Sequence, residues 1–209
     1  MGLIKRRRNE KRTRQNSSYF NKHSLIEPKF KGEAHFDPYY LFKVLLIGYS
    51  DSGSIDYLKS FGDAWFKENT KLSIGISFEI KKIKIEHLNI KLQIWDLSIK
   101  DRWRDLIPFY CRGAVGAILM FEISNSETFQ ILSKWIKIIR DNTKNIPVIL
   151  IGNRDDLRQV TKQQSLDFVR SEQLNGYIEC NVLTGENVNN VFESLTRMIL
   201  MNIKPKLSI

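Results

Sequence analysis

The sequence predicts a three-layer α/β domain, in which helices flank a mostly parallel β-sheet. Two uniformly apolar runs, 113–123 and 146–151, are typical of central parallel strands that are covered on both faces. Helical patterns alternate with the strand patterns along the chain, which is the order that builds a parallel sheet. The chain of 209 residues is long enough for one such domain and a tail.

The N-terminal half of the domain contains a strand, a helix and a hairpin in that order. The apolar run 41–47 predicts a buried strand, and a helical pattern follows over 53–66. The alternating runs 76–86 and 90–95 predict two paired strands at a sheet edge. Their turn is expected at His87-Leu88-Asn89.

Three helices are predicted in the C-terminal half. An apolar stripe over 126–142 predicts one helix, with Ser126 as its N-cap. The sequence from Thr161 to Gln164 is a capping box, so a second helix is expected from there to Leu174. Apolar spacing predicts the third helix from 188 to about 201.

Charge divides the chain into an arm and a body. Residues 1–22 hold eight Lys or Arg and one Glu, and so carry +7 of the net charge of +10. This composition predicts a disordered basic arm over 1–37, followed by the domain at 38–203 and a short tail at 204–209. The arm suits contact with an anionic membrane, and nucleic acid is the less favoured partner. A solvated tail without any partner agrees equally well with the composition.

Cysteine usage and hydropathy point to a cytoplasmic protein. Cys111 and Cys180 have no metal-ligand spacing and offer no disulfide framework. No apolar run approaches the roughly 20 residues of a membrane-spanning helix. No cysteine follows Cys180, so no prenylation site is expected and any membrane contact should be peripheral.

A glycine-rich turn follows the first strand. Gly48 and Gly53 have the spacing of the phosphate-binding loop G-x-x-x-x-G-K-[ST], in the same strand–turn–helix context. Ser54 stands at the position of the phosphate-binding lysine, and Ile55 at that of the magnesium-binding hydroxyl. Taken alone, the turn favours a packing role over tight phosphate binding.

Five motifs in order resemble those of Rab-type small GTPases of the Ras superfamily. The resemblance runs from about residue 41 to 202 and rests on LSIGISF at 72–78, KLQIWD at 91–96, YCRGA at 110–114, GNRDDL at 152–157 and TGENV at 184–188. It implies a P-loop NTPase-type domain with a six-stranded sheet. It also implies GTP or GDP as the ligand and GTP hydrolysis as the family activity.

At the phosphate end, the resemblance implies a weakened site. The nucleotide-binding positions carried over to this turn are Gly48, Ser50, Asp51, Ser52, Gly53, Ser54 and Ile55. Loss of the lysine is expected to weaken binding tenfold to a hundredfold or more. Ser73 and Asp96 match the switch I hydroxyl and the magnesium-linked carboxylate, which together predict only a weak Mg²⁺ site.

The resemblance also places Lys100 where the family has the glutamine that orients the attacking water. Lysine only donates hydrogen bonds, so it positions water poorly. Ile99 replaces the flexible glycine just before it. No catalytic residue is therefore expected, and intrinsic hydrolysis should be slow or absent.

At the base end, the resemblance implies a retained guanine pocket. Asn153, Arg154 and Asp156 match the family's N-K-x-D motif, in which the aspartate accepts hydrogen bonds from the guanine edge. We expect the Asn153 amide to tie this loop to the glycine-rich turn and the Arg154 stem to lie along the purine. Asn181, Val182 and Leu183 replace the family's S-A-K, and the Val182 N–H can still reach the base. Glu122 is interpreted as a surface or packing position.

Together these features predict a monomeric regulatory or trafficking module of small-GTPase fold. Effector or regulator proteins are expected on a switch-like surface around 74–78 and 100–110. Two alternatives remain open. One is an active, divergent GTPase in which Lys100, Lys59 or a basic residue of the arm or of a partner replaces the lost lysine. The other is an adapter that binds membrane or nucleic acid through the arm.

Overall fold

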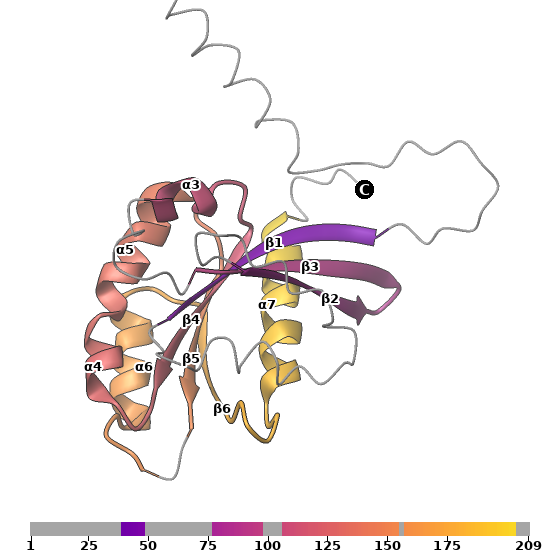
Figure 1. Ribbon diagram of the computed structural model, residues 1–209. Helices are drawn as coiled ribbons and strands as arrows, with labels where there is room; N and C mark the ends of the chain where they lie inside the picture. The colour runs from indigo at the N-terminus through magenta and orange to yellow at the C-terminus, as the bar shows by residue number, and fades with distance from the viewer. Residues whose placement is uncertain (1–38, 49–76, 98–105, 155–156, 204–209) are drawn as a thin grey trace, which may run out of the picture.

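The computed structural model describes residues 39–48, 77–97, 106–154 and 157–203. They form a six-stranded sheet in the order β2-β3-β1-β4-β5-β6, with helices on both faces (Figure 1). Only β2 runs antiparallel to its neighbour; every other pair is parallel. This arrangement confirms the predicted three-layer, mostly parallel α/β domain. The predicted arm, the helix at 53–66 and the tail lie outside the described residues.

The strands follow the hydrophobic patterns of the sequence. Every residue of β4 except its last, Glu122, is buried, as expected for a central strand with helices on both faces. In β3, buried and partly buried residues alternate, as expected nearer the sheet edge. The bounds are β1 Tyr39–Gly48, β2 Ser77–Ile85, β3 Leu88–Asp96, β4 Gly116–Glu122, β5 Val148–Asn153 and β6 Gly176–Cys180.

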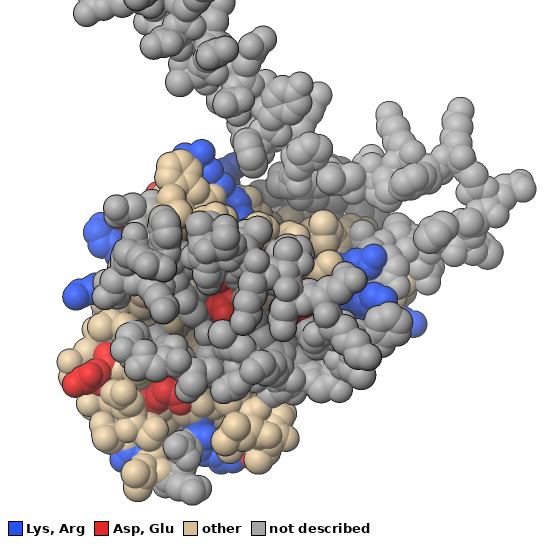
Figure 2. Space-filling view, viewed as in Figure 1, with Lys and Arg blue, Asp and Glu red and all other residues tan. Residues whose placement is uncertain are grey.

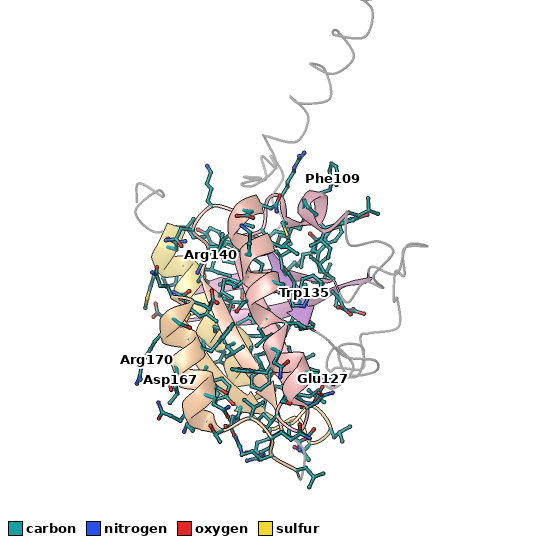
Figure 3. All side chains as sticks on the ribbon, turned by 90° about the vertical axis from the view of Figure 1, so that its left-hand side faces the viewer. Phe109, Glu127, Trp135, Arg140, Asp167 and Arg170 are labelled. Atoms are coloured by element: carbon teal, nitrogen blue, oxygen red, sulfur yellow. The ribbon has the colours of Figure 1, made fainter. Side chains whose placement is uncertain are left out.

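The described helices divide unequally between the two faces. One face is covered by α7 (Val188–Ile203). The other face carries the remaining helices, and Figure 3 views the molecule from that side. These are α3 Ile107–Cys111, α4 Ser126–Gln130, α5 Leu132–Asn142 and α6 Lys162–Ser171.

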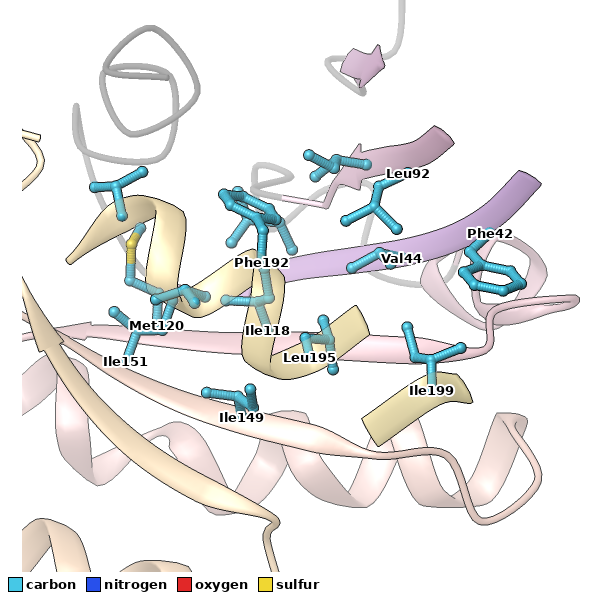
Figure 4. Packing of buried hydrophobic residues seen from close by; sticks show 14 of the residues in the cluster. Phe42, Val44, Leu92, Ile118, Met120, Ile149, Ile151, Phe192, Leu195 and Ile199 are labelled. Carbon is cyan, nitrogen blue, oxygen red and sulfur yellow. The ribbon is translucent and has the colours of Figure 1, made fainter. Parts of the chain in front are cut away.

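Each face of the sheet has its own hydrophobic core. Along β1, Val44 and Leu46 face α7, whereas Leu45 and Ile47 face the opposite helices. On the α7 side, buried residues of the helix pack over β1, β3, β4 and β5 (Figure 4). Because burying a large aliphatic or aromatic side chain contributes about 1.5–3 kcal/mol, these two cores hold the strand ends in fixed positions.

The β2–β3 hairpin turns earlier than predicted. The structure places the turn at Glu86 and His87, so Leu88 and Asn89 already belong to β3. Glu86 has a φ of 55°. A two-residue hairpin turn requires positive φ because its twist must match that of the strands. The predicted turn at 87–89 was therefore wrong by its last two residues.

The predicted helix 126–142 is divided in two. α4 ends at Gln130 and α5 begins at Leu132. The N-cap of α4 is Asn125, whose Oδ1 accepts the Glu127 N–H at 3.0 Å, so the assignment of Ser126 as N-cap was wrong. Asparagine and serine cap helices about equally well, so the backbone decides: Asn125 is extended, with φ −134° and ψ 101°, whereas Ser126 already belongs to the helix.

The capping box at the start of α6 is confirmed. Thr161 Oγ1 accepts the Gln164 N–H at 3.2 Å, and the Gln164 side chain accepts the Thr161 N–H at 2.8 Å. The helix ends at Ser171 rather than Leu174. Gln173, just beyond it, has a φ of 53°, which ends the helical geometry.

Candidate functional site

The carboxyl ends of the parallel strands meet at one edge of the sheet. The register pairs Leu46 with Asp96, Glu122 with Asn153, and Asn153 with Cys180. Ligands of open α/β sheets bind beyond this edge, because loops and helix starts converge there. The described site positions, which are Gly48, Asp96, Asn153, Arg154, Asn181, Val182 and Leu183, all lie at or just after these strand ends.

Gly48 ends β1 where the neighbouring strand comes very close. A Cβ atom at this position would lie 2.6 Å from the Met120 carbonyl oxygen and 3.0 Å from the Met120 Cβ. Packing against β4 is therefore sufficient to require glycine here. The rest of the glycine-rich turn, Ser50, Asp51, Ser52, Gly53, Ser54 and Ile55, lies outside the described residues, so its contacts remain a prediction.

Asp96 is buried at the end of β3. The next residue, Leu97, donates its N–H to the Leu46 carbonyl at 2.9 Å and extends the ladder past it. The main chain that carries this carboxylate is thus fixed beside the end of β1. Its predicted companions Ser73 and Lys100 lie outside the described residues, so the Mg²⁺ site stays a prediction.

Asn153 is the best-defined polar group of the site. Its Nδ2 donates to Glu122 Oε2 at 2.8 Å, and its Oδ1 accepts the Val182 N–H at 3.2 Å. One buried side chain therefore joins the ends of β4 and β5 to the loop after β6. The expected tie to the glycine-rich turn involves residues that the structure does not describe.

Val182 uses its N–H differently from the prediction. This group was expected to reach the base, but it donates to Asn153 Oδ1. Contact with a base would require this hydrogen bond to be broken or shared. Leu183 is 84% exposed and leaves its side chain available to pack against a ring.

Asn181 shapes the loop after β6. Its Oδ1 accepts the N–H groups of Leu183 at 2.9 Å and Thr184 at 3.0 Å. Its backbone N–H donates to the Glu186 carbonyl at 3.1 Å. An asparagine that binds N–H groups two and three residues ahead stabilises a turn, so this side chain positions the loop.

Arg154 ties the two base-end loops together. Its backbone N–H donates to the Cys180 carbonyl at 2.7 Å. Its guanidinium forms an ion pair with Glu186, and both side chains are about half exposed. The head group is therefore held by Glu186, and the expected position of the stem along the purine stays a prediction. Asp156, the predicted guanine acceptor, lies outside the described residues.

Burial and two nearby carboxylates act on the one cysteine at this end. Burial, reinforced by the negative charges of Glu122 and Glu186, raises the pKa of the Cys180 thiol to about 12. The thiol is thus protonated at neutral pH and unsuited to nucleophilic or metal chemistry. Among the described residues, no group of three His, Cys, Asp or Glu side chains is arranged to hold a metal ion.

Glu122 is the residue whose role the sequence analysis missed. It was interpreted as a surface or packing position, but it holds the Asn153 amide. Its position in the sequence could have indicated this role. Glu122 directly follows the apolar run of β4, just as Asn153 follows that of β5. Neighbouring parallel strands bring such terminal residues together.

Comparison with known proteins agrees with this geometry. The sequence model of the Ras family matches residues 43–201. The chain belongs to the Ras family. The Ras-related protein RABA4b of Arabidopsis thaliana is 37% identical over 171 residues, covering 80% of this chain and 76% of the relative. Rab11E of Lotus japonicus is 37% identical over 174 residues, covering 81% and 78%.

These relatives place this Ras-family protein among the Rab-type small GTPases of the Ras superfamily, as the five motifs indicated. The probable Ras-related protein Rab-4A of Echinococcus multilocularis is also similar, at 35% identity over 170 residues, covering 79% of this chain and 76% of the relative. The sheet order and its flanking helices are those of the P-loop NTPase type. In the described part of the chain, no helix has the length and apolar character needed to span a membrane.

Proposed function

We propose that this Ras-family protein is a regulatory module that binds GTP or GDP, holds the phosphates and Mg²⁺ weakly, and hydrolyses GTP little or not at all. Family membership supports guanine-nucleotide binding. The proposal of weak phosphate binding and slow hydrolysis is supported by a contrast between the two ends of the site. The base end keeps a connected polar framework, whereas three phosphate-end positions carry Ser54, Ile55 and Lys100.

The base end fits a guanine. Asn153 is held on both sides, so the loop that carries Asp156 starts from a fixed position. A carboxylate there accepts hydrogen bonds from the guanine edge, which adenine does not supply. The ion pair from Arg154 to Glu186 joins this loop to the one after β6. This pre-formed arrangement lowers the ordering cost of binding.

The phosphate end supports weaker contacts. Ser54 carries no positive charge, and a hydrogen bond to a charged group contributes about 1.5–3 kcal/mol, so affinity should fall tenfold to a hundredfold or more. Ile55 has no oxygen to offer Mg²⁺, an ion that demands octahedral oxygen ligands. Ser73 and Asp96 would supply one hydroxyl and one carboxylate. Lys100 cannot accept a hydrogen bond from an attacking water.

Partner proteins would dock on the switch-like surface around 74–78 and 100–110. Its described part supports this proposal. Phe109 is 60% exposed, and the Arg112 guanidinium lies 5.2 Å from its ring centroid. Trp95 packs against Tyr110 with ring centroids 5.8 Å apart. Exposed aromatic side chains are enriched among the residues that form protein–protein interfaces.

Titration calorimetry with GDP and GTP, with and without Mg²⁺, tests the proposal. Wild-type protein should bind weakly and gain little from Mg²⁺. The double variant Ser54→Lys/Ile55→Ser should bind at least about tenfold more tightly, and Mg²⁺ should add more to its affinity than to that of the wild type. Asn153→Ala is the matched base-end control: it should lose binding in either condition.

Three results would contradict the proposal. Tight Mg²⁺-dependent binding by the wild type, unchanged by the double variant, would mean that another cation holds the phosphates. Single-turnover hydrolysis faster than the slow intrinsic rate of small GTPases, abolished by Lys100→Ala or Lys59→Ala, would establish the active divergent GTPase. Absence of any guanine-nucleotide binding would leave the fold as an interaction scaffold only.

A further inference from the structure

A cavity of about 870 Å³ lies at the amino ends of β5 and β6, at the edge of the sheet opposite the nucleotide site. The C-terminal ends of α5, α6 and α7 surround it. Its volume falls within the roughly 300–1,000 Å³ that is typical of ligand sites. The proposed nucleotide site uses none of its lining residues, which include Arg140, Ile146, Pro147, Glu172, Met198 and Met201.

Apolar side chains from two parts of the chain line this cavity. Ile146 and Pro147 lie just before β5 and are buried. Met198 is half-buried and Met201 is 71% exposed, although both belong to the last turns of α7. Covering an exposed methionine removes apolar surface from water, and its flexible side chain adapts to what covers it. The lining therefore favours an occupant with aliphatic side chains.

Partial negative charge gathers around the cavity. The C-terminal end of a helix carries about half an elementary negative charge, and three such ends meet here. α5 and α6 each have a basic residue in the last turn, Arg140 and Arg170. The Arg140 guanidinium donates to the Ile146 carbonyl at 3.0 Å and, just beyond α6, to the Gln173 carbonyl at 3.2 Å (Figure 3). The last turn of α7 has no basic residue, so a cation just beyond it would be stabilised.

The cavity also holds a carboxylate. Among the residues that the structure describes, Glu172 forms no ion pair, and its Oε1 accepts the Ser133 hydroxyl at 2.9 Å. An occupant with an amine would therefore find an oriented carboxylate. The β2–β3 hairpin has the opposite character, because blue side chains gather on the right of Figure 2, where this hairpin lies in Figure 1. A cationic segment would be repelled there and attracted to the cavity.

The sequence that follows α7 complements the cavity. Residues 204–209 read KPKLSI and lie outside the described part of the chain. In an extended backbone, alternate side chains share one side, which would group Pro205, Leu207 and Ile209 opposite Lys204 and Lys206. Proline favours this backbone, because it lacks the N–H that a helix needs and disfavours a helical residue before it. The segment thus offers one apolar edge and one cationic edge.

We propose that residues 204–209 dock in this cavity, with Leu207 and Ile209 against its methionines and a lysine against Glu172. The last turn of α7 already lines the cavity, so the segment begins at its rim. Six residues span at most about 20 Å, which keeps the segment beside the cavity. A short tether gives a millimolar effective concentration, so weak contacts are sufficient. A partner that bound either the segment or the cavity would have to break this contact.

Methyl NMR of the methionines tests the proposal. The sequence has four methionines, of which Met198 and Met201 line the cavity and Met120 is buried in the core. In full-length protein with labelled methionine methyl groups, Leu207→Ser/Ile209→Ser should move both cavity signals toward those of a protein that lacks the segment. The core signal should stay in place, which shows that the fold is intact. The basic arm is present in every protein compared.

The segment added as a peptide tests the individual contacts. In the protein that lacks the segment, millimolar KPKLSI should restore the cavity signals. KPKSLI has the same composition but places leucine on the lysine edge, so it should bind at least about threefold more weakly. Glu172→Gln should weaken KPKLSI binding about two- to fivefold. Glu193→Gln makes the same charge change on an exposed residue of α7 outside the cavity lining and should alter affinity less than about 1.5-fold.

Three outcomes overturn the proposal. These are identical cavity signals with and without the segment, equal affinity for the two peptides, or no response of the shortened protein to about 5 mM KPKLSI. Methionine shifts that grow with protein concentration would assign the contact to a second copy of the chain and so overturn docking within one molecule. Every measurement is made without nucleotide, so the proposed function is tested separately.

Discussion

At the scale of single residues, the orientation of Asn153 follows from the chemistry of its partners. A carboxylate only accepts hydrogen bonds and a backbone N–H only donates one. The Asn153 amide therefore turns its Nδ2 to Glu122 and its Oδ1 to Val182. Two groups of opposite hydrogen-bonding character select one of the two amide orientations, and the loop that follows starts from that fixed point.

Replacing Glu122 should destabilise the protein. Glu122→Ala leaves a buried Asn153 N–H without this charged acceptor, at a cost of about 1.5–3 kcal/mol in the free energy of unfolding. Glu122→Gln keeps an acceptor oxygen, so its free energy of unfolding should fall by less than half as much. Urea denaturation of the three proteins measures this difference. An alanine variant as stable as wild type would mean that the hydrogen bond contributes nothing.

The buried thiols should make the protein less stable in alkali. Burial raises the pKa of Cys180 to about 12 and that of Cys111 to about 11, whereas an unfolded thiol titrates near 8.5. Their stabilising contribution is present below about pH 8.5 and is lost as pH rises toward these folded values. Each thiol should lower the free energy of unfolding by about 1.4 kcal/mol per pH unit in that window.

Denaturant titrations between pH 7 and 10.5 test the thiol prediction. Cys180→Ala removes one ionising group, so its stability should fall less steeply with pH than that of wild type. Its lower starting stability, caused by lost packing, does not affect the slope. Identical slopes for the two proteins would exclude Cys180 as a source of the alkaline loss.

At the scale of elements, two glycines differ in what an added Cβ atom would meet. At one it would meet the backbone of a neighbouring strand, and at the other the end of a side chain. A Cβ at Gly48 would lie 2.6 Å from the Met120 carbonyl oxygen, which is fixed in β4. A Cβ at Gly116 would lie 2.7 Å from the Ile199 Cδ1, the end of a side chain that can rotate. Gly48→Ala should therefore cost about 3 kcal/mol, and Gly116→Ala about 1 kcal/mol. Thermal or urea unfolding ranks them, and the reverse order would contradict the register at the end of β1.

The elements also show what the sequence could and could not predict. Uniform apolar runs identified β4 and β5, because only central parallel strands need both faces apolar. The sequence analysis located no strand at 176–180, because β6 is a short edge strand whose residues are mostly half buried. The break at Ile131 was missed, since the apolar stripe continues across it. Hydrophobic periodicity indicates which residues are buried, but it does not indicate where the helical hydrogen bonding is interrupted.

At the scale of the whole molecule, the motifs predicted which strand ends form the site but not how they connect. Asn153 was recognised from its motif, whereas Glu122 acts only because β4 and β5 are neighbours in register. Contacts across strands need the topology, so sequence motifs alone do not supply them.

Charge is also distributed at the scale of the whole chain, and this predicts a role for the arm. Residues 1–22 carry +7 of the net +10, so their deletion leaves +3. Each basic residue near an anionic surface adds about 1 kcal/mol, so the deletion should reduce binding to phosphatidylserine vesicles at least tenfold. Vesicle sedimentation at low and physiological salt measures this, because such binding weakens as salt rises.

A full-length variant with the eight basic residues changed to Gln controls for length and should behave like the deletion. Undiminished vesicle binding by both proteins would exclude the arm as a membrane contact, and loss of RNA binding alone would assign it to nucleic acid.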